Sequence, residues 1–322
     1  MVVTGPRPAP GRCGLAETDP AELGEALVLA WDDFLDVVRA PGTDLDRPSR
    51  LKGLSGRDVL VHLGEWPDNQ VVDSVLSSAA VGGHGTSDPP GDGNAELIAA
   101  HQGATTEQVV GAVVAARDRL QHFFDGPDAG VWGRSLARST VGPLPVLSLL
   151  HAGTFELAVH ALDLAPCGAP PPSDHLLDRG LAALIDITGS LCAGAGVDLE
   201  VTAASPAGGW RFATGPAVGA DGGWTTTHVE PGGFEGVGVS GPATDLLDAA
   251  AGRTHLPQLL LGRRIHVQEM TQWLRLAPLL DDLPGLPGGA ALASAAAGLS
   301  GVAGGLSSLT GAASRALDRF RR

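Results

Sequence analysis

Basic residues are scarce in this sequence, and tyrosine is absent. The chain contains a single lysine, Lys52, beside twenty arginines, and its formal net charge is −15 at pH 7. A surface this acidic repels the phosphates of nucleic acids and of anionic membranes. We therefore expect no nucleic-acid partner. The scarcity of lysine and tyrosine is typical of GC-rich coding, and we assign it no function.

Cysteine is also rare. The three cysteines, Cys13, Cys167 and Cys192, are scattered along the chain, and no CxxC pair occurs. Such a set does not form a disulfide framework and is typical of a reducing cytosol, so we expect a cytoplasmic protein. None of the three has a neighbouring histidine or lysine that would mark a nucleophile. The first residues also lack the apolar run of a secretory signal peptide, and none is expected.

The composition otherwise predicts a globular protein with room for two domains. Apolar residues make up 43% and charged residues 18% of the 322 residues. We expect the α+β class, with an N-terminal antiparallel four-helix bundle over residues 15–165 and a small α+β domain over residues 174–283. The Pro/Gly-rich residues 1–14 are expected to be disordered, and residues 284–322 form a low-complexity Ala/Gly/Ser tail.

Apolar periodicity, caps and helix breakers predict the individual elements. Asp19 before Pro20 predicts one helix start, and Ser55 with Asp58 has the spacing of a capping box. Pro67 is expected to kink or interrupt the second helix. The predicted helices cover 19–40, 55–80, 106–124, 144–165, 174–192, 241–251 and 269–280; the predicted strands cover 197–203, 210–213, 224–230, 237–240 and 264–268; and residues 81–94 are expected to form a loop.

The stretch over residues 149–165 carries the first chemical signal. In its predicted helix, Glu156 and His160 lie about 40° apart on one face, one turn from each other. A carboxylate and an imidazole in this arrangement can reach one metal ion, although an exposed ion pair explains most such spacings. His151 falls on the opposite side of the helix and is not expected to be a ligand. Apolar neighbours leave little of this helix polar, which favours the metal site: Leu157, Val159, Leu162 and Leu164.

Two separated segments resemble a known family. Residues 54–62 (LSGRDVLVH) and residues 156–164 (ELAVHALDL) together resemble the mycothiol-dependent maleylpyruvate isomerase family, within the DinB-like superfamily of metal-binding four-helix bundles. The family has an Arg-Asp pair at the start of a His-bearing helix and a Glu-x-x-x-His-x-x-Asp-Leu motif farther along the chain. Residues 239–253 (VSGPATDLLDAAAGR) resemble the start of a C-terminal helix in the sterol-carrier-like second domain of these proteins.

This resemblance implies metal ligands at His62, Glu156 and His160. Two neutral imidazoles and a carboxylate suit a divalent ion, most simply zinc, with a free position for water or a thiol. The implied thiol cofactor is mycothiol, whose sulfur adds to the double bond of maleylpyruvate, permits rotation and leaves again. We therefore predict a metal- and mycothiol-dependent isomerase or thiol transferase acting on a small organic substrate. The alternative is a non-catalytic protein that binds a metal or another ligand, for example in regulation.

Three further residues are candidates for this site. Asp163 could orient a metal ligand or hold a water, and it could equally bond to a neighbouring backbone group or arginine. Trp66 could line a cofactor-binding pocket or pack in the core. Arg253 matches a family arginine that reaches from the second domain toward substrate carboxylates. A favourable charge at a helix C-terminus is the alternative for it, and Arg263 and Arg264 are rivals for the same role.

The C-terminal tail combines apolar residues near helical spacing with many small residues, and ends in a cluster of arginines. Each glycine opposes a helix by about 1 kcal/mol relative to alanine. We therefore expect a tail that is disordered in isolation. Contact with a membrane surface or with the protein itself is the alternative, and the arginines favour an anionic surface.

Overall fold

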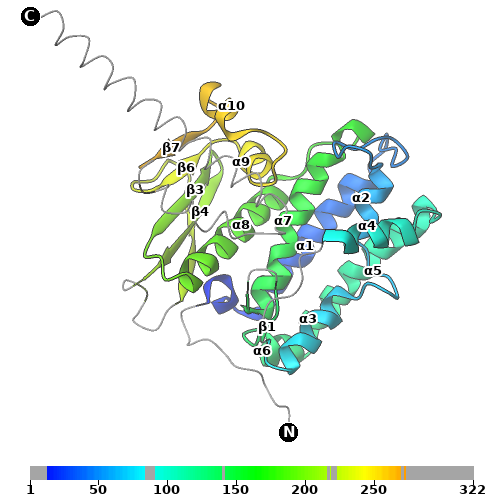
Figure 1. Ribbon diagram of the computed structural model, residues 1–322, viewed down its shortest axis with the longest axis horizontal. Coiled ribbons are helices and arrows are strands. Elements are labelled where there is room, and N and C mark those ends of the chain that lie inside the picture. Colours follow the sequence, from blue (N-terminus) through cyan, green and yellow to red (C-terminus); the bar gives the residue numbers. More distant parts are fainter. Residues whose placement is uncertain are drawn as a thin grey trace, which may run out of the picture.

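The computed structural model describes residues 13–83, 91–139, 142–215, 218, 223–269 and 272. The protein belongs to the α+β class, as predicted, with a helical part beside a five-stranded sheet (Figure 1). Helices α7 (Val146–Asp163) and α8 (Asp174–Gly194) pack against each other between these parts, and α8 also packs on the sheet. Of the helices described, none is both long and apolar enough to span a membrane.

Helix α1 (Pro20–Arg39) begins as the sequence predicts. The Asp19 carboxylate accepts a hydrogen bond from the Ala21 N–H at 2.8 Å, and Pro20 occupies the first turn, where its missing N–H has no helical partner to lose. One face of α1 packs against α5 (Thr106–Asp125), α7 and α8. Its buried apolar residues include Leu23, Leu27, Ala30, Phe34 and Val38.

Helix α2 (Gly56–Leu63) begins at the predicted capping box. The side chains of Ser55 and Asp58 each accept a hydrogen bond from the other residue's backbone N–H. The helix ends before Pro67, and α3 (Val71–Ala80) begins after it, so the predicted interruption is confirmed. Helix α2 contacts α5 and α7, and α3 also contacts α5 and α7, so two short helices take the place of one long one.

Helix α4 (Gly91–Ala100) corrects the predicted loop over residues 81–94, because the helix begins inside that range. Leu97 and Ile98 of α4 pack against the apolar core, and the helix contacts α2. Burial of these side chains outweighs the low helix propensity of its glycines. The elements between α5 and α7 are α6 (Asp128–Trp132), β1 (Leu136–Ala137) and β2 (Leu144–Pro145).

The five-stranded sheet has the order β5-β4-β3-β6-β7. Strand β3 pairs antiparallel with β4 and parallel with β6. Because β6 follows β5 in the chain but lies beside β3, the connection from β5 to β6 crosses over β4 and β3. All five predicted strands are present, with bounds shifted by up to a few residues. The strands are β3 (Glu200–Ser205), β4 (Gly208–Thr214), β5 (Trp224–Val229), β6 (Gly238–Ser240) and β7 (His266–Gln268).

Two helices lie between the last two strands. Helix α9 (Ala243–Ala250) was predicted, whereas the single-turn helix α10 (Leu256–Leu261) was not, since so short a segment shows no clear periodicity. Of the predicted helix 269–280, only residues 269 and 272 are described. The C-terminal tail and the expectations for it lie outside the described residues.

The N-terminal segment η1 (Gly14–Glu17) connects the helical part to the sheet. Cys13 forms a β-bridge with Trp224, and the Leu15 N–H donates to the Asp186 carboxylate at 2.9 Å. Gly14 has a φ of 54°, and a Cβ on it would lie 2.0 Å from an Asp186 oxygen, so the close approach requires glycine. Cys13 and Gly14 are buried, which corrects the expectation of disorder for these two residues; residues 1–12 lie outside the described part.

The apolar core continues across the linker between the two predicted domains. Leu176 and Ala183 of α8 and Leu247 of α9 belong to the same buried cluster as Phe34 and Leu60 of the helical part. A second buried cluster includes other residues of α8 together with residues of the sheet. Helix α8 therefore contributes apolar residues to both parts, and the exact domain limits stay a prediction.

Candidate metal centre

Helices α2 and α7 bring the three predicted metal ligands together. Glu156 and His160 lie one turn apart on α7, and His62 is near the end of α2. One ligand atom from each residue lies within 4.8 Å of the other two. Glu156 Oε2 is 3.3 Å from His160 Nε2 and 3.8 Å from His62 Nε2. The carboxylate thus faces both imidazole rings.

Hydrogen bonds on the far side of each ring determine which nitrogen faces Glu156. His62 Nδ1 is 3.1 Å from the Val59 carbonyl oxygen, and His160 Nδ1 is 3.0 Å from Asp163 Oδ2. Because both partners are acceptors, each Nδ1 carries a proton and donates it. In the neutral rings the Nε2 lone pairs then face the Glu156 carboxylate. Two imidazole nitrogens and one carboxylate oxygen are a donor set that suits zinc and similar divalent ions.

Burial and charge oppose each other in this cluster. Burial alone would raise the pKa of Glu156, but in the absence of a metal the protonated forms of His160 and His62 hydrogen-bond to it, and these bonds and charges outweigh burial and lower the pKa to about 2. Burial alone would lower the pKa of His160, but the Asp163 and Glu156 carboxylates raise it above its usual value. Glu156 is therefore ionised at neutral pH and available as an anionic ligand.

Asp163 supports His160 from the side away from Glu156. Its side chain is fully buried, and Arg253 donates to it from Nε at 3.0 Å and from Nη2 at 2.9 Å. Burial alone would raise the pKa of Asp163, but the hydrogen bonds from His160 and Arg253 lower it. The Arg50 backbone N–H also donates to the Asp163 carbonyl at 2.9 Å. Asp163 therefore contacts both a candidate metal ligand and an arginine, and its role at the site stays a prediction.

Arg253 lies just beyond α9 and reaches the helical part, where its guanidinium donates to Asp163. Its remaining terminal nitrogen, Nη1, donates to the Ala251 carbonyl at 3.1 Å. Of the two rivals proposed from the sequence, Arg264 pairs with Asp245, and Arg263 is exposed. The structure thus brings Arg253 to the metal centre through Asp163, and the two rivals lie elsewhere.

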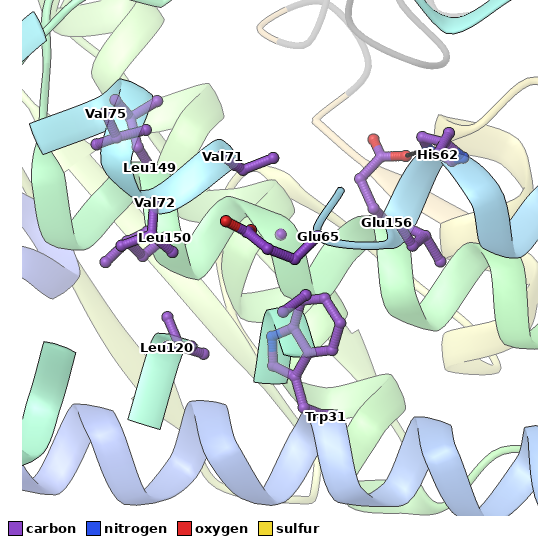
Figure 2. A pocket seen from close by; sticks show the side chains of 13 residues that line it. Trp31, His62, Glu65, Val71, Val72, Val75, Leu120, Leu149, Leu150 and Glu156 are labelled. Carbon is purple, nitrogen blue, oxygen red and sulfur yellow. Dashed lines mark ion pairs between the residues drawn. The ribbon is translucent and has the colours of Figure 1, made fainter. Parts of the chain in front are cut away.

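A cavity of about 200 Å³ adjoins the candidate metal ligands (Figure 2). His62 and Glu156 lie at one end, Val75 and Leu149 lie at the other, and Glu65 lies between them. Among the described residues that line the cavity, none is lysine or arginine. The other lining residues are apolar or glycine: Trp31, Leu63, Val71, Val72, Ala116, Leu120, Leu150 and Gly153.

Trp66 is not among the residues that line this cavity. Its ring stacks on that of His101, with centroids 3.9 Å apart, and its indole N–H donates to the Val61 carbonyl at 2.8 Å. The cofactor-binding role considered for Trp66 stays a prediction. His151, which was not expected to be a ligand, is fully buried, and neither ring nitrogen has a hydrogen-bond partner in the described part of the chain.

Sequence reasoning missed Trp31 and Glu65 as neighbours of the metal centre. Glu65 follows His62 by three residues, a spacing that could have identified it, although the chain has left the helix by then. Trp31 comes from α1, and Figure 2 shows its ring directed toward Glu65. No local pattern connects Trp31 to the site, because only the packing of α1 brings it there.

These features define a helical part of the molecule in which a His-Glu-His cluster adjoins a largely apolar cavity. Residues 27–165 match the family model described as the mycothiol maleylpyruvate isomerase N-terminal domain. The match confirms the resemblance seen in the sequence, and it includes His62, Glu156 and His160. No curated protein matches the chain.

Two solved structures resemble this chain in part. A mycothiol-dependent maleylpyruvate isomerase has 19% sequence identity and a TM-score of 0.46, over 75% of this chain and 92% of that chain. A mutant described under the same name has 20% identity and a TM-score of 0.45, over the same shares of the two chains.

Proposed function

We propose that this protein is a metal-dependent enzyme that uses mycothiol as its thiol cofactor and acts on a small organic substrate, as an isomerase or as a thiol transferase. The observation that carries this proposal is the convergence of His62 Nε2, His160 Nε2 and Glu156 Oε2 beside a cavity that His62 and Glu156 line. Three protein ligands would leave a coordination position open, as in catalytic zinc sites. A divalent ion held there would lower the pKa of a bound thiol enough to give a thiolate at neutral pH.

The protein's own side chains have supporting roles in this proposal. Asp163 holds the Nδ1 proton of His160, and the Val59 carbonyl holds that of His62, so both rings keep Nε2 free to bind. The apolar walls of the cavity would exclude water from the reacting groups, which strengthens electrostatic interactions there. Among the described lining residues none is cysteine, so the nucleophilic sulfur would come from the cofactor.

Metal analysis and cobalt substitution test this proposal. Protein purified without chelators should carry a full equivalent of divalent metal. Mycothiol added to cobalt-substituted protein should produce new sulfur-to-cobalt absorption, and a substrate panel should show turnover only when mycothiol is present. The same thiol added to His160→Ala provides the control. An unchanged spectrum at saturating mycothiol would support the alternative, a metal-binding protein without thiol chemistry.

A further inference from the structure

The cavity beside the candidate metal ligands has a charge balance that does not suit an anionic substrate. Its ionisable lining side chains, among the described residues, are His62, Glu65 and Glu156. Two of these are carboxylates, and burial followed by the charge of Asp73 raises the pKa of Glu65. The raised pKa favours the neutral form of Glu65, so the main cost for a substrate carboxylate placed here is the loss of its hydration, with no lysine or arginine among the described lining residues to pair with it.

Two described arginines near the site, Arg253 and Arg119, are already paired with other groups. Arg253 donates to Asp163 from two nitrogens and to the Ala251 carbonyl from the third. Arg119, whose charge acts on Glu65, forms an ion pair with Asp73. A bound divalent ion would add two positive charges, but Glu156 and a thiolate would neutralise both. In the described part of the chain, neither of these two arginines is then left unpaired to hold a dicarboxylate.

The walls of the cavity suit an uncharged, apolar molecule. Apart from the three ionisable residues, they consist of aliphatic side chains, the Trp31 indole and Gly153. A closed apolar cavity of about 150 Å³ binds benzene in another protein. The cavity of about 200 Å³ found here is large enough for such a ring with a short substituent.

We propose that this cavity binds a neutral, largely apolar substrate of about the size of a substituted benzene ring, and that it discriminates against dicarboxylates. The inference rests on the proposed function only because it calls the ligand a substrate. The lining residues and the shape of the cavity do not depend on it.

Direct binding of two probes to the metal-loaded, full-length protein tests the inference. Toluene represents the neutral apolar class, and maleate represents the dicarboxylates. We expect calorimetry to give a dissociation constant for toluene at least about tenfold lower than that for maleate. Toluene should also change the tryptophan fluorescence, and Trp31→Phe should lose this change because Trp31 lines the cavity.

A pair of glycine substitutions separates binding in the cavity from binding elsewhere. A Cβ on Gly153 would meet no atom within 4 Å, so the side chain of Gly153→Leu can extend into the cavity without a backbone clash. Gly111, on α5, is equally open but exposed and is not among the lining residues. Gly153→Leu should weaken toluene binding at least about tenfold and leave the metal content unchanged, whereas Gly111→Leu should change neither.

The outcomes distinguish this inference from the proposed function. Maleate binding as tight as toluene binding, or toluene binding that survives Gly153→Leu unchanged, would overturn the inference even if metal and mycothiol bind. Conversely, toluene binding that depends on Gly153 in a protein that shows no cobalt–thiol absorption would support the inference while the proposed function fails.

Discussion

Arg253 and Asp163 form a bidentate ion pair although they lie 90 positions apart in the sequence. Arg253 lies just beyond α9, and Asp163 is the last residue of α7, so the pair joins the sheet side of the molecule to the helix that carries Glu156 and His160. Asp163 in turn accepts the Nδ1 proton of His160 at 3.0 Å. The orientation of one candidate metal ligand thus depends on a residue of the C-terminal part.

Replacing Arg253 should weaken metal binding without removing a ligand. Arg253→Ala leaves the buried Asp163 carboxylate with fewer donors, so His160 is held less firmly. We expect metal affinity to fall by about 10- to 100-fold, the range seen for residues that orient metal ligands. Competition with a chelator measures the affinity. The metal affinity of Arg253→Lys should lie between those of Arg253→Ala and the unmodified protein, because lysine keeps the charge but loses the forked geometry. An unchanged affinity in Arg253→Ala would contradict this role.

Each of the three candidate ligands should be necessary for metal binding. His62→Ala, Glu156→Ala and His160→Ala each remove one donor, and we expect the metal content to fall from about one equivalent to near zero in each. The far-ultraviolet circular dichroism should keep most of its helical signal, because the apolar core of α7 remains. His122→Ala, on the exposed face of α5, is the control. A full equivalent of metal in His160→Ala would show that the site is elsewhere.

The buried His151 should make the protein sensitive to acid. Burial, and then the charge of Arg179, lower the pKa of His151 from 6.5 to about 3 in the folded protein. As the pH falls below 6.5, His151 becomes protonated in the unfolded state but stays neutral in the folded state. The free energy of unfolding therefore decreases, by up to about 1.4 kcal/mol per pH unit. Above pH 6.5 this residue has no such effect.

The His151→Leu variant isolates this contribution. Neither ring nitrogen has a hydrogen-bond partner among the described residues, so leucine removes the titration without leaving a donor or acceptor unpaired. Urea unfolding at pH 7.5 and pH 5 should show a smaller loss of stability in the variant than in the unmodified protein. His122→Leu, at an exposed position, should keep the original pH dependence. Equal losses in His151→Leu and the unmodified protein would mean that His151 titrates normally.

The cap of α2 should contribute to overall stability. The Ser55 hydroxyl accepts a hydrogen bond from the Asp58 N–H at 3.2 Å, and the Asp58 carboxylate accepts one from the Ser55 N–H at 2.7 Å. Ser55→Ala should lower the free energy of unfolding by about 1 kcal/mol, as is usual for the loss of an N-cap. Ser77→Ala, at an exposed position within α3, should leave it nearly unchanged. Denaturant titration compares the two variants.

Local features of the chain determined most of the individual elements. The Asp19 cap and the Ser55–Asp58 capping box could be predicted from the sequence because they involve residues a few positions apart. The arrangement of Glu156 and His160 could also be predicted, because the period of an α-helix alone places them on one face. The break at Pro67 follows from the geometry of proline.

Tertiary structure decided which distant groups meet at the site. Arg253 pairs with Asp163 because the packing of α9 against α7 brings it there, and its expected reach toward a substrate stays a prediction. Trp31 and Glu65 line the cavity only because α1 and the segment after α2 pack around α7. The glycines of residues 81–94 predicted a loop, but α4 begins inside this range because Leu97 and Ile98 pack against the core. In each case the interaction that decides the outcome joins residues far apart in sequence, and its free energy appears only when the core is assembled.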